Sequence, residues 1–222
     1  PARITAVAAA SDAPIPREAD DAYILSCGGE EAVAATKSVV EQTLFYDMLY
    51  RRWAGKSSID RSALADAMDE ALRWEIPREI VETAVQAPVI YFAGRNDGVA
   101  EELALETNEI TRKKSDFLEG TYAVHGIEEV MRPEEVVVLV DPFPEEEAKF
   151  DQVLQQGVGL KVVAIASEVR RFPTIQVPRS EEYAPYLQLL AGWNLLVEIG
   201  LAAGINLDKP ARARKVGNEY AG

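Results

Sequence analysis

The sequence predicts an α/β fold built around a parallel β-sheet. From residue 89 onward, short apolar runs alternate with segments of helical periodicity, as expected for strand–helix–strand units. The runs at 136–140 and 160–166 are almost continuously Val, Ile, Leu and Ala. Strands with this composition are typical of sheets covered by helices on both faces. The sequence therefore predicts a three-layer α/β/α arrangement.

The first 87 residues predict a smaller α/β segment followed by helices. Two short apolar runs, 4–9 and 22–25, read as strands joined by a polar loop at 11–21. Apolar residues at helical spacing then predict a long buried helix over 30–54, which ends at Gly55. Two further helices, 61–74 and 76–87, are expected to form a linker.

The remaining elements are expected to complete one full α/β unit. The predicted strands are 89–93, 136–140, 160–166 and 174–177, and the predicted helical segments are 99–113, 122–131, 144–156 and 184–203. Ligands of such sheets bind beyond the carboxyl ends of the strands. The loops of interest are therefore 94–98, 141–144 and 167–172.

Composition excludes several classes of function. The 222 residues carry a formal charge of −14, which opposes binding to nucleic acid phosphates or anionic lipid headgroups. The single cysteine, Cys27, provides no internal disulfide and no paired metal ligands, so a reducing cytoplasm is the expected location. The apolar run 186–205 is interrupted by polar side chains and predicts a buried helix rather than a membrane span.

Three glutamates on the predicted helix 99–113 are candidates for proton transfer. Glu102, Glu106 and Glu109 lie at i, i+4 and i+7, beside the apolar stripe of Val99, Leu103 and Ile110. Carboxylates there are either hydrated in a cleft, paired with cations, or protonated with a raised pKa, the last being typical of a general acid or base. A solvated acidic face is the alternative interpretation.

Other candidate groups are few. His125 is the only histidine, so any histidine chemistry depends on it, and no ligand cluster supports a metal site. Gly28-Gly29 could present backbone N–H groups to an anion, but the following glutamates argue against this. In the tail, Lys215 and its basic neighbours could attract an acidic substrate or attack a carbonyl, or simply form a solvated end.

Four segments in order resemble the sugar isomerase (SIS) domain family, best known in the isomerase half of glutamine:fructose-6-phosphate amidotransferase. Residues 28–37 resemble its GPExxVAxTK segment, and residues 93–95 resemble the GRG at the end of a strand in its second domain. Residues 102–110 resemble its EGALKLKEI helix, and His125-Gly126 lies at the spacing of its HG pair. Residues 208–215 resemble its C-terminal DxPRxLxK signature. The resemblance implies one partial and one complete SIS domain: residues 1–57 as the C-terminal part of the first domain, 58–87 as a helical linker, 88–205 as the second domain, and 206–222 as a tail contributing to the active site.

The resemblance also implies roles for individual residues. Glu109 would be the base that moves a proton between C1 and C2 of an open-chain phosphosugar, His125 would assist ring opening, and Lys215 would hold or activate the carbonyl end. Val33 and Ala35 would line the sugar pocket, and Glu102 and Glu106 would contact substrate. The histidine of relatives reaches a neighbouring subunit's site, so a homodimer is implied, with no cofactor, nucleic acid or membrane.

Two departures from the family pattern narrow the expected chemistry. Glu106 replaces a lysine, and an extra carboxylate beside the base suits a cationic amine; this favours deamination or deglycation of an aminosugar or fructosamine 6-phosphate over simple isomerisation. The family's SxSGxT phosphate loop does not occur. We therefore expect it to precede Pro1. A non-catalytic sugar-phosphate sensor and an inactive structural remnant are the alternatives to an enzyme.

Overall fold

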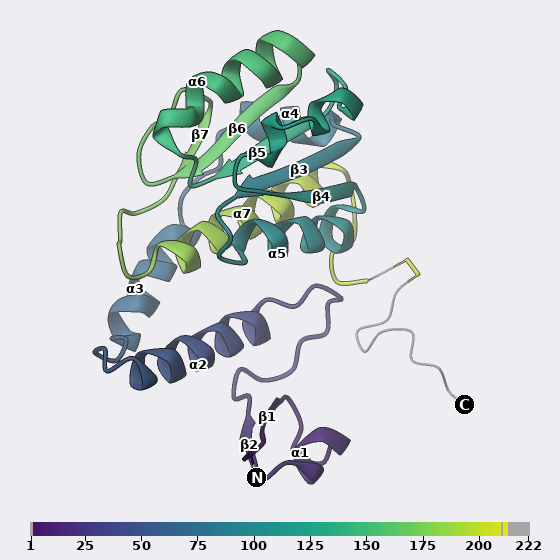
Figure 1. The fold of residues 1–222 in the computed structure, drawn as a ribbon. Coiled ribbons are helices and arrows are strands. Elements are labelled where there is room, and N and C mark those ends of the chain that lie inside the picture. Colours follow the sequence, from purple (N-terminus) through teal and green to yellow (C-terminus); the bar gives the residue numbers. More distant parts are fainter. Residues whose placement is uncertain (1, 210, 213–222) are drawn as a thin grey trace. The chain divides into compact units, whose positions relative to one another are not determined.

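The computed structural model describes residues 2–209 and 211–212, which form two compact units (Figure 1). The first unit contains residues up to Asp60, and the second contains residues 61–212. Lys215, a predicted site residue, lies outside the described residues.

The first unit is a strand–helix–strand motif followed by one long helix. Strands β1 (Thr5–Ala8) and β2 (Asp21–Ile24) pair in parallel, and the short helix α1 (Pro14–Glu18) connects them. We predicted a loop where α1 lies, because its two prolines signal a break; proline is, however, accepted in the first helical turn.

The prediction of a long buried helix over 30–54 was wrong at its start and in its burial. Helix α2 spans Lys37–Trp53, and none of its residues is buried. Residues 30–36 are non-helical because the Glu30 side chain bonds to the start of the helix. Within the described part of the first unit, this helix has only the two-stranded sheet and the short helix α1 as companions. Val33 therefore belongs to the loop rather than to a buried stripe.

The second unit contains a five-stranded parallel sheet, which confirms the predicted fold class. Its strands are β3 (Val89–Gly94), β4 (Lys114–Glu119), β5 (Val136–Val140), β6 (Lys161–Ala166) and β7 (Thr174–Gln176). They are ordered β4-β3-β5-β6-β7, and every pairing is parallel. Strand β4 was not predicted, because four of the six residues in its sequence KSDFLE are polar. It lies at the edge of the sheet, where only one side needs a partner.

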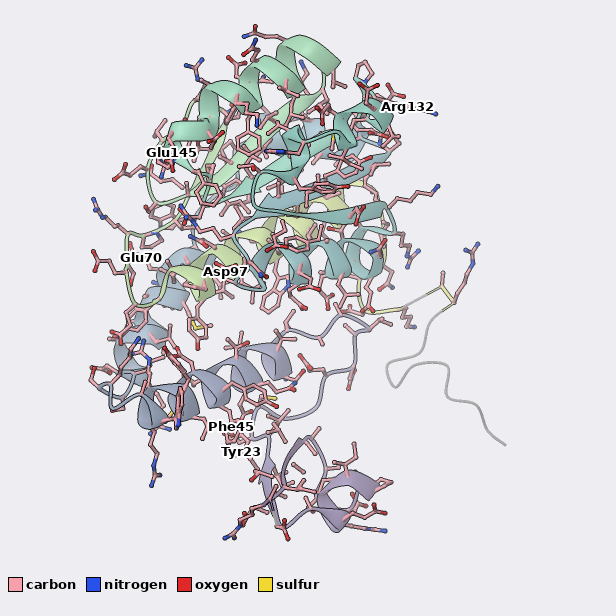
Figure 2. The ribbon with its side chains drawn as sticks, viewed as in Figure 1. Tyr23, Phe45, Glu70, Asp97, Arg132 and Glu145 are labelled. Carbon is pink, nitrogen blue, oxygen red and sulfur yellow. The ribbon has the colours of Figure 1, made fainter. Side chains whose placement is uncertain are left out.

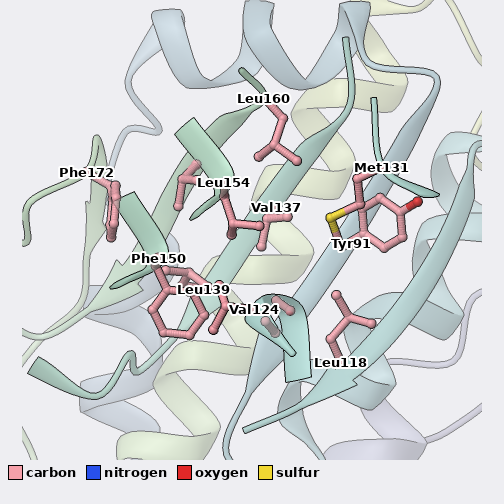
Figure 3. Packing of buried hydrophobic residues seen from close by; sticks show 13 residues of the cluster. Tyr91, Leu118, Val124, Met131, Val137, Leu139, Phe150, Leu154, Leu160 and Phe172 are labelled. Atoms are coloured by element: carbon pink, nitrogen blue, oxygen red, sulfur yellow. The ribbon is translucent and has the colours of Figure 1, made fainter. Parts of the chain in front are cut away.

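Helices cover both faces of this sheet. On one face, a cluster including Tyr91, Val137 and Leu139 packs against Phe150 and Leu154 of the helical segment after β5 (Figure 3). That segment is a 3-10 turn (Pro144–Glu146), helix α6 (Glu147–Phe150) and a π-helical stretch (Asp151–Val158).

The opposite face is covered by α5 (Val99–Glu106) and α7 (Ala184–Ala202), which pack against each other (Figure 1). Twelve residues of α7 are buried, so the predicted buried helix at 184–203 is confirmed. Helices α3 (Arg61–Leu72) and α4 (Arg78–Gln86) also pack against α7, and they belong to the same compact unit as the sheet. Within the described part of the chain, no helix has the length and apolar character required to cross a bilayer.

Candidate functional site

The candidate glutamates lie on α5 and on the turn that continues it, which follow the carboxyl end of β3, the strand next to the edge strand β4. Gly98 takes a positive φ of 87° at the start of α5, and the Asp97 Oδ1 accepts a hydrogen bond from the Val99 N–H at 3.1 Å (Figure 2). Desolvation, followed by the neighbouring Asp141 carboxylate, raises the pKa of Asp97. The first free N–H of the helix is thus capped by the chain's own carboxylate.

The end of this helix widens into a π-helical turn, Thr107–Thr111, which carries Glu109. Three side chains here donate hydrogen bonds to carbonyls of the preceding turn: Thr107 Oγ1 to Leu103 O at 2.7 Å, Asn108 Nδ2 to Ala104 O at 3.0 Å, and Thr111 Oγ1 to Thr107 O at 2.6 Å. Such side-chain bonds compete with the backbone ladder and distort helices. A π turn inside an α-helix often marks a functional position.

The three glutamates occupy different environments. Glu106 is buried, with 2% of its surface exposed, whereas Glu109 is exposed. Glu102 is partly buried, and its Oε1 atom has no hydrogen-bond partner among the described residues. Burial, followed by repulsion from the Glu109 carboxylate, raises the pKa of Glu102. The structure therefore brings Glu102 and Glu109 within electrostatic range, as the helical spacing predicted.

A groove of about 470 Å³ runs between α5 and the edge strand β4. Its lining residues are Gly98, Glu101, Glu102, Ala104, Leu105, Asn108, Ser115, Asp116 and Phe117. The accessible lining of this groove is mostly apolar, and the carboxylates of Glu101, Glu102 and Asp116 give it a local acidic character. Of the three candidate glutamates, Glu102 lines it.

His125 follows a 3-10 turn (Tyr122–Val124) beyond the end of β4. Its side chain is exposed, and its Nε2 lies 3.2 Å from the Nζ of Lys149. Lys149 lies on α6, so this contact connects the His125 turn to the helical segment after β5. The neighbouring Ala123 and Val124 anchor the turn in the buried cluster under α6.

The structure does not bring Glu109 and His125 together within one chain. Glu109 lies just before the start of β4, and His125 follows its end. Six strand residues separate the two positions by about 17 Å along the sheet. Moreover, the turn before His125 packs on the face opposite α5.

Predicted loops at the carboxyl edge of the sheet do meet. Arg95 Nε donates to Asp141 Oδ2 at 2.5 Å, and the guanidinium lies 4.2 Å from the centre of the Phe143 ring. Asp141 has a positive φ of 46°, which is uncommon for a residue with a side chain. The sequence shows Arg95 only as part of the Ala93-Gly94-Arg95 motif. Its ion pair with Asp141 could not be predicted, because the two residues are 46 positions apart in the sequence.

The first unit holds its candidate residues in the loop between β2 and α2. Val33 and Ala35 are both partly buried there. Glu30 and Glu41 bind backbone groups at the two ends of the loop, an arrangement that sequence reasoning missed. Glu41 also accepts a hydrogen bond from Tyr23, whose ring stacks on Phe45 with 4.4 Å between ring centres (Figure 2). Among the described residues, no group of three or more His, Cys, Asp or Glu side chains is arranged to hold a metal ion.

Comparisons with known proteins agree with the resemblance seen in the sequence. No family model matches the chain. A glutamine–fructose-6-phosphate aminotransferase (isomerizing) from Halobacterium salinarum is 26% identical over 222 residues, which cover 90% of this chain and 37% of that protein. The chain spans less than two-fifths of the length of the curated relatives it matches.

Two solved structures show the same fold. The C-terminal domain of glucosamine-fructose-6-phosphate aminotransferase from Francisella tularensis matches with a TM-score of 0.74 and 20% identity, over 93% of this chain and 64% of that one. Glucosamine-6-phosphate deaminase from Thermotoga maritima matches with a TM-score of 0.75 and 19% identity, over 95% of this chain and 65% of that one. The chain therefore has the three-layer fold of the sugar isomerase domains, and the predicted resemblance to that family is confirmed.

Proposed function

We propose that this chain belongs to a phosphosugar-processing enzyme that couples aldose/ketose isomerisation to deamination or deglycation of an aminosugar or fructosamine 6-phosphate. The observation that carries the proposal is a pair of carboxylates on α5 and the π turn that continues it, an exposed Glu109 near a partly buried Glu102 with a raised pKa. One group is suited to accept a proton and the other to retain one. The names of the related proteins above support phosphosugars as the substrate class.

In the proposed reaction, Glu109 removes the proton from the carbon next to the carbonyl, C2 of the aldose or C1 of the ketose, and returns it to the former carbonyl carbon, while a proton moves between the O1 and O2 oxygens. The negative charge that develops on the oxygen is stabilised by Lys215, which acts as the cation at the carbonyl end. Val33 and Ala35 contact the sugar, and Glu102 and Glu106 provide the acidic surroundings that favour a protonated amine.

His125 is proposed to assist ring opening in the site of a second copy of the chain. Glu109 and His125 of one chain lie beyond opposite ends of β4, which supports this arrangement. A cytoplasmic homodimer follows from the proposal, with neither nucleic acid nor membrane as a partner, in keeping with the charge of −14.

The test is the Glu109→Gln variant of the full-length protein, with turnover measured on glucosamine 6-phosphate, fructosamine 6-phosphates and the parent aldose and ketose phosphates. Glutamine keeps the shape but loses the proton acceptor, so we expect kcat to fall on the order of 10² to 10⁴-fold with a much smaller change in ligand affinity. Glu198→Gln, at an exposed position on α7 away from the groove, is the matched control. Full turnover in Glu109→Gln would remove this residue from the mechanism, and binding without turnover across the panel would identify a sensor.

A further inference from the structure

The loop between β2 and α2 is held at both ends by carboxylates. Residues 28–36 form neither helix nor strand, so they lack the repeating backbone bonds that fix such elements. The backbone bonds from both flanks of this loop are instead accepted by Glu30 and Glu41.

Glu30 connects the loop to the start of α2. Its Oε1 accepts hydrogen bonds from the Thr36 N–H at 2.8 Å and the Lys37 N–H at 2.7 Å, and its Oε2 accepts one from Ser38 Oγ at 2.5 Å. The loop thereby closes on itself through six to eight residues. A carboxylate at a helix N-terminus also interacts favourably with the helix dipole.

Glu41 holds the other end of the loop from within α2. It accepts hydrogen bonds from the N–H groups of Ser26 and Cys27 at 2.8 and 2.7 Å, and from Ser26 Oγ and the Tyr23 hydroxyl at 2.8 and 3.0 Å. These bonds, those from Ser26 N–H first, lower the pKa of Glu41 to about 2. Glu41 is therefore ionised at neutral pH, and the end of β2 is fixed to the helix.

Lys37 adds a third connection across the loop. Its Nζ donates to the Gly29 carbonyl oxygen at 2.8 Å, while its own N–H is bound to Glu30. Residues 31–35, which include Val33 and Ala35, lie between these attachments. The Glu30 bonds therefore fix the end of this stretch that joins α2, and the Lys37 bond to Gly29 connects that end to its start.

We propose that Glu30 is a positioning residue for substrate: its carboxylate sets the conformation in which the loop presents Val33 and Ala35 to the sugar. This inference rests on the proposed function, and it adds a residue whose effect is on binding rather than on proton transfer. A free loop would lose conformational entropy each time it closed on substrate, whereas the bonds to Glu30 impose that loss during folding. Loss of these bonds should therefore weaken substrate binding and leave the chemical step almost unchanged.

The experiment compares Glu30→Gln, Glu30→Asp and Glu31→Gln in the full-length protein. Glutamine replaces one acceptor oxygen with a donor that cannot pair with an N–H group, whereas aspartate keeps a carboxylate on a shorter side chain. Glu31 is the neighbouring exposed carboxylate and is the matched control. Two quantities are measured: amide hydrogen exchange across 28–38, with and without glucosamine 6-phosphate, and KM and kcat for that compound.

For Glu30→Gln we expect exchange at Thr36 and Lys37 to be on the order of 10-fold faster and KM to rise by a similar factor, with kcat within about threefold of wild type. Glu30→Asp should fall between Glu30→Gln and wild type, and Glu31→Gln should match wild type. The inference is overturned if Glu30→Gln does not speed exchange, if it speeds exchange without raising KM, or if kcat falls as much as KM rises. Wild-type protein that shows neither turnover nor ligand-dependent protection would instead refute the proposed function, and with it the role of Glu30 toward substrate.

Discussion

Gly192 of α7 lies against Leu103 of α5, and we expect its substitution by alanine to be strongly destabilising. A Cβ at this position would overlap both Cδ atoms of Leu103 and lie 2.9 Å from its Cγ. Leu103 has no exposed surface, so its side chain cannot move into solvent. Overpacking of a buried site typically costs 1 to 3 kcal/mol, and because three atoms of a fully buried residue are overlapped we expect about 3 kcal/mol.

A double-mutant cycle tests whether this contact is the cause. Leu103→Ala alone should cost about 3 kcal/mol through the cavity it leaves. In the double variant the overlap is absent and the new methyl group partly fills that cavity. The free energies of unfolding, measured by urea denaturation, should then be non-additive by about 2 kcal/mol or more.

Gly157→Ala is the matched control, because it adds the same methyl group in another helical segment. There the nearest atom to the new Cβ is the Gln152 carbonyl oxygen at 3.4 Å. We expect no loss of stability, and a gain of up to about 1 kcal/mol from the helix preference of alanine. Additivity within about 0.5 kcal/mol for the Gly192 and Leu103 changes would refute the packing explanation.

Two further predictions concern Glu102 of α5 and Glu109 of the π turn that follows it. Glu102→Gln should raise the melting temperature at pH 7. Burial raises the Glu102 pKa above its ordinary 4.5, so the contribution of the Glu102 carboxyl to stability is complete below pH 4.5 and is lost as pH rises through the folded-state pKa. Glutamine carries no charge and avoids this loss. The difference from wild type, followed by thermal melts, should vanish below about pH 4; a difference that grows toward acid would contradict the sign. Separately, mixing inactive Glu109→Gln and His125→Ala proteins after denaturation and refolding should restore about a quarter of wild-type activity if each site uses both copies, because half the dimers are mixed and each holds one intact site. Continued inactivity of the mixture would place both residues in the same chain's site.

The second unit was largely predictable, because strands buried on both faces have a distinctive composition. Runs such as 136–140 have no polar positions, and the predicted strand limits there agree with the structure. Strand β4 was missed for the converse reason: this edge strand begins with three polar residues and has only two apolar ones, Phe117 and Leu118. Local sequence cannot show whether such a segment has a neighbouring strand to pair with.

The candidate site was predictable only in part. Helical spacing correctly indicated that Glu102 and Glu109 influence each other, but it could not show that Glu106 is the buried member of the three. It also placed Glu30 within a helix, where the structure has it binding the start of that helix from outside. Bonds of this kind depend on a loop folding back over six or more residues, and no periodic signal records them.

The π-helical turn Thr107–Thr111 also has a genetic consequence. A π turn holds one residue more than the α-helical turn it replaces, so it is the expected product of a single-codon insertion into a regular helix. Deletion of the Asn108 codon should accordingly be tolerated better than a deletion within α5, because the remaining residues can return to α-helical geometry. The same deletion would leave Glu102 in place but would turn the Glu109 side chain about the helix axis by roughly 100° from its present direction, the rotation of one helical residue. A change of one codon in this segment would therefore alter the direction of the Glu109 side chain while the helix that carries Glu102 is retained.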